Sequence, residues 1–506
     1  RETTFAFDAA GRLQTRTDPL GTVTRYEFDA LGQVVAEHVA HGTSEVRTTR
    51  NVYDSQGRLI AQTRAADTAI AATTQYTYDA FGQQVAVTDP RGHELATTDS
   101  AWALAQRKTH GFVNETGAPL RVADLTAAQQ EQLRAMYTST QTFDASGNIT
   151  RSTDALGASI ERTFDAFGNV IRVVDARGFA GTFVFHGRDR VVAQIDPAGY
   201  VTVTDYGVDD QTTTIQRYLQ RYSGDPNGDP RGQVGGPVAT TTLRYDALGR
   251  LVESIDAHGG RETWVHGWTT NGPPRREVVY TNKLGGVVTR EYDLQGQLRR
   301  ERGPVMIGAQ VPAETQYAYN GFGELTFKSE YLSQYVARHT GYEYDKAGQL
   351  VRITHPSPLG AETRSYDRAG NLTAIVDGRG HRSAFYFDAA NRQIGQVDAT
   401  GALSTTQFDA AGHAIAVRRY ATAVTLPAGA TLPTGSGAYR ETLTQVDANG
   451  RVIETRIVGV LTGRMVGDDY QTSTADIVQS WAYDRGGLLA RHTDAKGHRA
   501  RQFFDE

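Results

Sequence analysis

The sequence predicts an all-β fold, an array of antiparallel β-hairpins, because one short phrase recurs along the whole chain. The phrase is aromatic-Asp-x-x-Gly, and its intact copies place Asp at positions 8, 29, 54, 79, 144, 165, 246, 293, 345, 367, 409 and 484. The tightest spacing is 21 residues, as from Asp8 to Asp29. A fixed period of this size indicates a repeat architecture. A catalytic residue is needed only once, so we interpret the phrase as structural.

The residues before each Asp are expected to form a strand, because they alternate between two faces. In residues 22–28, Thr22, Thr24, Tyr26 and Phe28 share one face. Aromatic residues two positions apart recur there, as Tyr76/Tyr78, Tyr317/Tyr319, Tyr342/Tyr344 and Phe385/Phe387. We predict that paired strands stack these rings into ladders, with each neighbouring pair contributing roughly 0.2–1 kcal/mol.

Asp followed three residues later by Gly is typical of a tight turn. The carboxylate can accept a backbone hydrogen bond, and Gly tolerates a positive φ. The chain is therefore expected to reverse at each phrase. The structural repeat residues that we single out are Tyr53, Asp54, Gly57, Tyr78, Asp79, Gly82, Tyr245, Asp246, Gly249, Tyr344, Asp345 and Gly348.

A second turn is expected to join each hairpin to the next. It begins with Asp and ends with Gly three residues later, at residues 18–21, 89–92, 154–157, 196–199 and 398–401, as type I turns prefer. At about 22 residues per repeat, the chain would form roughly 23 hairpins. Such a sheet cannot stay flat, because strand twist accumulates. We predict one coiled sheet over residues 1–506, whose outer face lies in water and whose inner face needs either large side chains or something enclosed.

The array is interrupted by one predicted helical insertion, residues 118–138. Residues 125–136 have helix-forming composition, and Thr126 with Gln129 resembles a capping box. We expect this helix to cover a sheet edge or plug an opening, or alternatively to bind a partner. The segments 206–243, 426–433 and 463–469 are interpreted as long connections or elongated hairpins.

Composition excludes several classes of function. A net charge of −5 with dispersed arginines gives no reason to expect a nucleic-acid partner. No apolar run approaches the roughly 18–20 residues that span a bilayer. The absence of cysteine excludes disulfides and thiol nucleophiles but leaves the compartment open.

The sequence predicts no catalytic, cofactor-binding or metal-binding site. Residues 225–229 resemble the start of a calcium loop, but Pro230 and Gly236 replace the expected Gly and Glu. His93, His381, His413 and His498 each follow a turn Gly. We interpret them as surface residues beside turns rather than metal ligands. No phosphate-binding loop, His-Glu-x-x-His helix or Gly-x-Ser-x-Gly motif occurs.

The repeated phrase resembles the YD repeat of the RHS family. The copies at residues 7–13, 245–251 and 344–354 carry the resemblance, which extends over essentially the whole chain. It implies a β-hairpin strip that spirals into a hollow shell, as in bacterial Rhs polymorphic toxins, the C component of insecticidal toxin complexes and the animal teneurins.

In bacterial members, the resemblance implies that the shell encloses a C-terminal toxin, released by an aspartyl self-cleavage site with an Asp-Pro-x-Gly-Leu motif. Here residues 18–21, 89–92 and 196–199 continue into Thr22, His93 and Tyr200, so no protease residue is transferred to this chain. The chain begins and stops inside the repeat, and we expect it to be a segment of a longer polypeptide.

The leading hypothesis is therefore a non-enzymatic shell that encloses and shields an effector. Its expected partners are the enclosed C-terminal toxin domain of the same polypeptide, secretion machinery (a type VI spike or toxin-complex components) and an immunity protein. The protein is expected to be held in the bacterial cytoplasm and then secreted, or to lie at the cell surface. The alternative is an exported adhesion protein whose repeats bind carbohydrate or a partner cell.

Overall fold

The computed structural model describes residues 2–19, 21–208, 210–225, 228–269, 275–304, 313–331, 336–425, 431–466, 469–484 and 488–501. Within these residues, 37 strands form one sheet. Each strand pairs antiparallel with the next strand in the chain, as in β1–β2, β2–β3 and so on to β36–β37. The predicted all-β array of antiparallel hairpins is confirmed.

The first half of the sheet contains β1 (Thr4–Phe7), β2 (Leu13–Thr17), β3 (Val23–Phe28), β4 (Val34–Val39), β5 (Arg47–Tyr53), β6 (Leu59–Arg64), β7 (Ala72–Tyr78), β8 (Gln84–Thr88), β9 (Thr138–Phe143), β10 (Ile149–Thr153), β11 (Ser159–Phe164), β12 (Val170–Val174), β13 (Ala180–His186), β14 (Arg190–Ile195), β15 (Tyr200–Tyr206), β16 (Thr212–Arg221), β17 (Pro237–Tyr245) and β18 (Leu251–Ile255). The second half contains β19 (Arg261–Trp268), β20 (Arg276–Thr281), β21 (Val287–Tyr292), β22 (Leu298–Arg302), β23 (Glu314–Tyr319), β24 (Leu325–Tyr331), β25 (Ala337–Tyr344), β26 (Leu350–Thr354), β27 (Ala361–Tyr366), β28 (Leu372–Val376), β29 (Arg382–Phe387), β30 (Gln393–Val397), β31 (Leu403–Phe408), β32 (Ala414–Tyr420), β33 (Tyr439–Val446), β34 (Val452–Val466), β35 (Asp469–Tyr483), β36 (Leu489–Thr493) and β37 (Arg499–Arg501).

The turn formed by each aromatic-Asp-x-x-Gly phrase is here called the YD turn. The name includes the near copies of the phrase at residues 319–323, 387–391 and 446–450, whose backbone hydrogen bonds are the same. YD turns have one recurring geometry. At Asp54, the backbone N–H donates to the Arg58 carbonyl at 2.9 Å, and the Gly57 N–H donates back to the Asp54 carbonyl at 3.0 Å. One carboxylate oxygen accepts the N–H groups of Gln56 and Arg58, both at 2.9 Å. This is a type I turn closed by a left-handed Gly, with Gly57 at φ +82°.

Replacing Gly82 with alanine is expected to destabilise its hairpin by about 1 kcal/mol, because an L-residue is disfavoured at positive φ. Gly82 has φ +84°, and an added Cβ would meet only open space, so the cost is conformational rather than a clash. The matched control is Gly187→Ala, where space is also open and φ is not in the left-handed region. Denaturant unfolding of the two variants should differ, and equal midpoints would contradict this account.

The turn joining one hairpin to the next, here called the link turn, mostly repeats this geometry. The Gly157 N–H donates to the Asp154 carbonyl at 3.0 Å, and the Asp154 N–H donates to the Ala158 carbonyl at 2.9 Å. YD turns therefore line one long edge of the strip and link turns line the other. We name these the YD edge and the link edge.

Residues 89–92 depart from the prediction, because they begin a helix instead of a simple link turn. The Asp89 carboxylate accepts the N–H of Arg91, and Pro90 occupies the first helical turn of α1 (Pro90–Thr97). An Asp-Pro pair that opens a type I turn also suits a helix N-terminus. The sequence alone therefore does not distinguish a link turn from the first turn of a helix at these residues.

The helical insertion lies between β8 and β9, which still pair with each other. It contains α1, α2 (Ala101–Thr109), the 3-10 turn η1 (Val122–Asp124) and α3 (Ala127–Ala135). The predicted helix corresponds to α3, and its Thr126–Gln129 capping box is present. The expectation of a single helix was incomplete, since α1 and α2 were missed. The helices pack around a small core of Leu95, Ala96, Ala103, Leu125 and Leu133.

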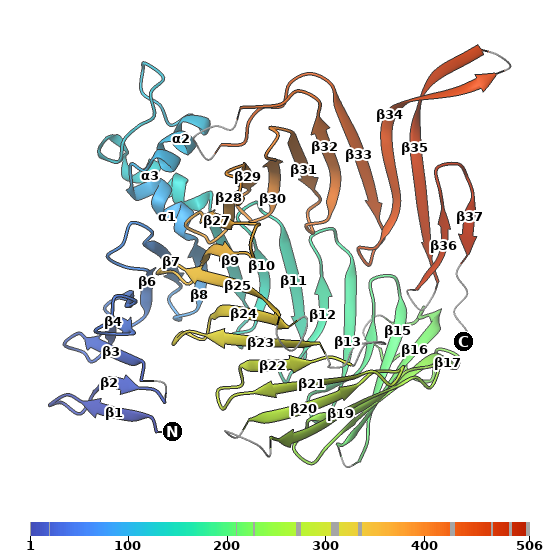
Figure 1. Cartoon of the computed structure of the whole chain (residues 1–506), viewed down its shortest axis with the longest axis horizontal. Helices are drawn as coiled ribbons and strands as arrows, with labels where there is room; N and C mark the ends of the chain where they lie inside the picture. Colours follow the sequence, from blue (N-terminus) through green and yellow to red (C-terminus); the bar gives the residue numbers. More distant parts are fainter. Residues whose placement is uncertain are drawn as a thin grey trace.

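The strip coils until its two edges meet. The link after β8 contacts the YD turn after β29, and the link after β12 contacts the YD turn after β33, an offset of 21 strands in both cases. Figure 1 shows the consequence, with β31–β33 lying beyond the ends of β11–β13. We call each such circuit a winding.

The wall of the coil is one sheet thick. The chain exposes 29081 Å², whereas a compact protein of 55.1 kDa would expose about 18,000 Å². Both sheet faces therefore remain largely uncovered by other parts of this chain.

Several sequence predictions fall partly outside the described residues. The calcium-like phrase includes residues 226 and 227, and the segment 426–433 includes residues 426–430. The segment 463–469 is the tip of an elongated hairpin of β34 and β35, whose residues 467 and 468 are not described. The copy of the phrase at Asp484 continues into residues 485–487, which are also not described.

Candidate functional site: the seam between windings

The link edge of the first winding and the YD edge of the second winding meet along a line that we call the seam. Link residues between 20 and 200 lie on one side, and YD turns between 320 and 450 lie on the other. Cavities of about 510, 530 and 640 Å³ follow this line. The seam is where residues distant in the sequence form specific polar contacts.

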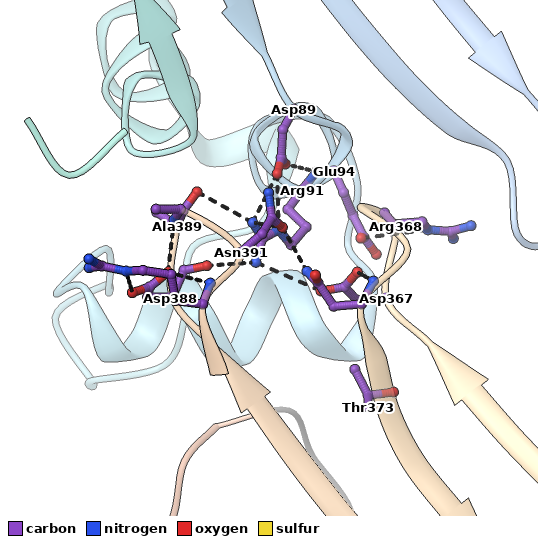
Figure 2. Close-up of polar contacts among 12 residues, drawn as sticks. Asp89, Arg91, Glu94, Asp367, Arg368, Thr373, Asp388, Ala389 and Asn391 are labelled. Carbon is purple, nitrogen blue, oxygen red and sulfur yellow. Dashed lines mark hydrogen bonds and ion pairs between the residues drawn. The ribbon is translucent and has the colours of Figure 1, made fainter. Parts of the chain in front are cut away.

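Arg91 crosses the seam from the first turn of α1 and is only 2% exposed. Its guanidinium donates to the Asp388 carbonyl at 3.0 Å and to the Asn391 side-chain oxygen at 2.8 Å, as Figure 2 shows. It is held in place by Asp89, whose carboxylate accepts a hydrogen bond from it at 2.9 Å. Arg91 thus binds the YD turn of the next winding through backbone and side chain together.

Arg177 forms the same contact four strands further on. It occupies the same position in its link turn, with Asp175 two residues earlier accepting its guanidinium at 2.9 Å. The guanidinium donates to the carbonyls of Asp447 and Ala448, both at 3.0 Å. Because carbonyls are the acceptors, an Asp-x-Arg-Gly link turn can bind any YD turn regardless of its side chains.

Near the start of the seam, Arg47 makes a different contact. It pairs with both carboxylate oxygens of Glu324 at 2.7 and 2.8 Å, a bidentate arrangement that favours arginine over lysine. Its guanidinium also lies 3.8 Å from the ring centroid of Phe322. At Gly321, an added Cβ would lie 2.7 Å from the Thr22 hydroxyl, so the two edges approach closely here.

The helical insertion also braces the seam. Glu94 on α1 lies 3.5 Å from Arg368 in the YD turn after β27, and both are labelled in Figure 2. The insertion thus covers part of the sheet edge through α1, whereas the same role for α3, the helix that the sequence predicted, stays a prediction.

Within a winding, neighbouring hairpins are linked at the YD turn. The Tyr78 hydroxyl donates to the Leu59 carbonyl at 2.9 Å. The Arg58 guanidinium lies 5.0 Å from the Tyr78 ring centroid and donates to the Asp79 carbonyl at 3.0 Å. Equivalent stacks are Arg12 on Phe28, Arg299 on Tyr319, Arg392 on Phe408 and Arg451 on Tyr483.

These stacks correct the predicted ladder of rings. Among the described residues, no ring pair joins the aromatic residues of two YD turns. Successive YD aromatics lie two strands apart, about 9.6 Å, which is too far for direct stacking. In the five copies named above, a guanidinium group from the turn or strand between them lies against the next ring instead.

Carboxylates at the seam have lowered pKa values. Burial alone would raise the pKa of Asp409, but hydrogen bonds from the His413 backbone and imidazole, together with Arg177, hold it below its ordinary value of 3.8. Burial would also raise the pKa of Glu324, but hydrogen bonds from Arg47 and Asn320 lower it below its ordinary value of 4.5. The ionised Glu324 therefore stabilises the seam through Arg47, whereas the ionised Asp409 mainly stabilises its own turn.

Acid is expected to open the seam. A group whose folded pKa is lowered contributes stability above its unfolded pKa and loses that contribution as pH falls through the folded value. The contributions of Asp409 and Glu324 should therefore be intact at neutral pH and lost below their ordinary values of 3.8 and 4.5. Hydrogen exchange at the YD turns 320–324 and 409–413 would detect the change, and acid-resistant protection at both turns would contradict it.

The structure places all twelve predicted repeat residues at YD turns. Gly57, Gly82, Gly249 and Gly348 have φ between +73° and +84°. The hydroxyls of Tyr53, Tyr78 and Tyr344 donate to carbonyls of the preceding hairpin at 2.9–3.0 Å. Of these four copies, the one at residues 344–348 lies along the seam, next to the link residue Ser44, which binds Lys346.

Sequence reasoning missed the seam arginines. The available signal was the third position of the link turn, where Arg91 and Arg177 share the pattern Asp-x-Arg-Gly. The pattern alone did not indicate that a partner turn lies opposite.

The four turn histidines fall into two groups. His381, His413 and His498 lie within 3.4 Å of the turn aspartates 377, 409 and 494. His93 instead lies on α1 and is half-buried, and burial lowers its pKa. It was therefore wrongly expected beside a surface turn.

Metal sites and membrane spans are not found in the described part of the chain. It holds no cluster of His, Cys, Asp and Glu side chains suited to a metal ion. No helix among those residues is both long and apolar enough to span a membrane.

Comparison with solved structures finds matches over nearly the whole chain. TcdB2-TccC3 without its hypervariable C-terminal region is 14% identical, covers 98% of this chain and 30% of its own, and has a TM-score of 0.49. TcdB2-TccC3-Cdc42 is 15% identical, covers 98% and 27%, and has a TM-score of 0.50. The Photorhabdus luminescens Tc holotoxin pore is 14% identical, covers 97% and 27%, and has a TM-score of 0.48. This chain thus spans less than a third of the chains it matches, and the likeness shows the fold.

Sequence comparisons give the family. Curated protein sequences contain no match to this chain. The RHS repeat profile, by contrast, matches residues 7–44, 53–94, 143–180, 344–382 and 366–403. These matches coincide with hairpins whose YD turns carry the geometry described above. Over these segments the chain therefore carries the RHS repeat.

Proposed function

We propose that this chain is a segment of a shell that encloses an effector domain and shields it until delivery. The observation that carries the proposal is the coil, in which the wall closes on itself through the seam with an offset of 21 strands. On this proposal residues 1–506 act as one shell unit, the helical insertion braces it, and the wall has no catalytic role.

The size of the coil suits an enclosed polypeptide. At about 4.8 Å per strand and a tilt of about 35–45°, 21 strands give a circumference of roughly 120–140 Å. A wall about 10 Å thick would leave a bore on the order of 30 Å. A compact domain of 100 residues has a diameter of roughly 34 Å, so a bore of this width favours a cargo that is not fully folded.

The proposed cargo is a C-terminal toxin domain of the same polypeptide, by analogy with the hypervariable C-terminal region of TcdB2-TccC3. Secretion machinery, either a type VI spike or toxin-complex components, and an immunity protein are the further proposed partners. The proposed route is retention in the bacterial cytoplasm followed by export.

The adhesion alternative receives less support. Binding of carbohydrate or a partner cell by the repeat faces would favour aromatic side chains exposed across those faces. The most exposed large apolar side chains instead lie in turns, as at Phe81, Phe167 and Leu284. The YD tyrosines, such as Tyr53 and Tyr78, are half-buried and hydrogen-bonded within the wall.

Limited proteolysis with mass spectrometry on the longest natural polypeptide tests the proposal. If the chain is a container, a C-terminal fragment should stay bound and resist protease under native conditions, and should become sensitive after denaturation. Arg91→Ala with Arg177→Ala should expose that fragment at least severalfold faster, whereas Arg379→Ala, at the same turn position but away from the seam, should not. A C-terminal region that is cleaved equally fast in native and denatured samples would exclude containment.

A further inference from the structure

The cavity of about 510 Å³ lies between the helical insertion and the second winding. It is lined by Glu94 and Trp102 of the insertion, by Ile70 from the link after β6, and by residues of β27, β28 and β29. Its volume lies within the range of sites that bind small organic molecules, about 300–1,000 Å³. Ile70 is 37% exposed whereas Tyr386 on β29 is 5% exposed, so the cavity opens beside the link after β6 and ends at β29. We call it the insertion cavity.

Tyr386 carries a hydroxyl group that the described fold does not use. The hydroxyl is buried and finds no hydrogen-bond partner among the residues that the structure describes. Burial raises the pKa of Tyr386, against the opposing effect of the Arg382 charge, so the hydroxyl stays protonated and can donate. Buried polar groups in native proteins are nearly always hydrogen-bonded. Because Tyr386 lines the insertion cavity, an acceptor held there would satisfy this hydroxyl.

Two of the arginines that line the cavity also lack a partner. The lining contains four arginines and two carboxylates, and it therefore carries net positive charge. Arg91 and Arg368 already contact carboxylates at the seam. The guanidinium groups of Arg64, at the exposed mouth, and of the half-buried Arg382 form no ion pair or hydrogen bond within the described ranges. Unpaired guanidinium groups in a partly desolvated cavity favour an anion.

Much of the remaining lining is aromatic. Trp102 on α2 meets Tyr137 edge to face, with ring centroids 6.0 Å apart and ring planes at 63°. Tyr366 and Phe385 also line the cavity and are half-buried. Such side chains bind the body of a small organic ligand, and a few polar groups orient it. The unpaired guanidinium and hydroxyl groups are all donors, so the preferred ligand combines a ring with negatively charged oxygen atoms.

We propose that the insertion cavity binds a small organic oxyanion, a sugar or nucleoside ring that carries a carboxylate or phosphate group. The charged oxygen atoms accept hydrogen bonds from Arg382 and Tyr386, and the ring packs against Trp102 and Phe385. The lining comes from both windings, so a ligand that binds only the closed coil also stabilises the closure. The site is formed by the wall itself and does not depend on the proposed cargo.

Isothermal titration calorimetry on the longest natural polypeptide tests the ligand class. Nucleoside monophosphates carry the phosphate form of the ligand, and hexuronic acids carry the carboxylate form. Inorganic phosphate supplies the charge alone, whereas nucleosides and hexoses supply the ring alone. One of the two ring-bearing anions should bind at least tenfold more tightly than its charge or its ring alone. Equal binding of inorganic phosphate, or no binding of either ring-bearing anion at about 1 mM, would overturn the proposal.

Tyr386→Phe assigns the binding to this cavity. It should weaken the ring-bearing anion at least tenfold without lowering the melting temperature, because the hydroxyl has no partner in the described fold. The matched control is Tyr366→Phe, since Tyr366 also lines the cavity but its hydroxyl donates to the Leu350 carbonyl at 2.7 Å. That control should lower the melting temperature and keep the affinity. Wild-type affinity in Tyr386→Phe would place the ligand elsewhere, including in a cargo, and would overturn the assignment.

Arg382→Gln tests the charge of the site. It should weaken the ring-bearing anion at least tenfold and leave the weak binding of the uncharged ring unchanged. Arg379→Gln is the control for overall charge, because Arg379 is exposed and is not part of the cavity lining. It should change neither affinity. Equal losses in the two variants would show that general charge rather than the insertion cavity attracts the anion, and would overturn the proposal.

Discussion

Replacing both Arg91 and Arg177 with alanine is expected to separate the two windings at the seam. Each guanidinium donates to a YD-turn carbonyl at 3.0 Å and is held by its own turn Asp at 2.9 Å. Removing one partner from a buried charged contact costs about 3–5 kcal/mol. Arg91, at 2% exposure, should lie near that range and the more exposed Arg177 below it.

A repeat array of this length need not unfold in one step, so a local measurement is preferable. Hydrogen exchange should accelerate in the YD turns 388–392 and 447–451, while the hairpins between them stay protected by their own ladders. Arg379→Ala removes the same residue from the same turn position without a seam partner, so it should change stability by no more than about 0.5 kcal/mol. If both variants exchange alike, the seam arginines do not hold the windings together.

Replacing Arg107 with alanine is expected to unfold the helical insertion. Arg107 is fully buried and donates to the Leu95, Leu120 and Thr98 carbonyls at 2.9, 3.0 and 2.5 Å. It also pairs with Asp99 at 2.8 Å. Alanine would leave these acceptors unsatisfied inside the helix cluster, at a cost of about 3–5 kcal/mol.

The readout is the helical signal in far-ultraviolet circular dichroism, together with proteolysis between residues 98 and 126. Arg107→Lys should recover only part of the loss, because one ammonium cannot reproduce the guanidinium fork. The control is Arg121→Ala, since Arg121 is 68% exposed and lies 3.9 Å from the same Asp99. Retention of the helical signal in Arg107→Ala would show that the cluster of Leu95 and Leu133 suffices without the buried arginine.

The local structure was predictable from the repeat because each turn and each helix cap is specified by a few neighbouring residues. Asp54 and Gly57 form their turn through contacts no more than four residues apart. The capping box of α3 was readable for the same reason. Residues 89–92 were interpreted as a turn, because the choice between a turn and α1 depends on the packing of Leu95 and Ala96 against residues 103–137, which the phrase does not contain.

The ladder of rings shows how a correct period can yield a wrong contact. The alternation placed the aromatic residues correctly at the YD turns, but their spacing of two strands left room for Arg58 and its equivalents. The sequence contains both the aromatic residues and the arginines, but only the strand spacing in the structure showed that a guanidinium lies beside each ring in these copies.

The all-β class, the antiparallel hairpins, the two kinds of turn and the need for the sheet to curl could be predicted from the repeat, because they follow from local backbone preferences and strand twist. The offset of about 21 strands, and the binding of Arg47, Arg91 and Arg177 to turns 270 or more residues away, could be seen only in the folded coil. That offset depends on twist and tilt accumulated over the whole strip. No single repeat specifies which turn will lie opposite it.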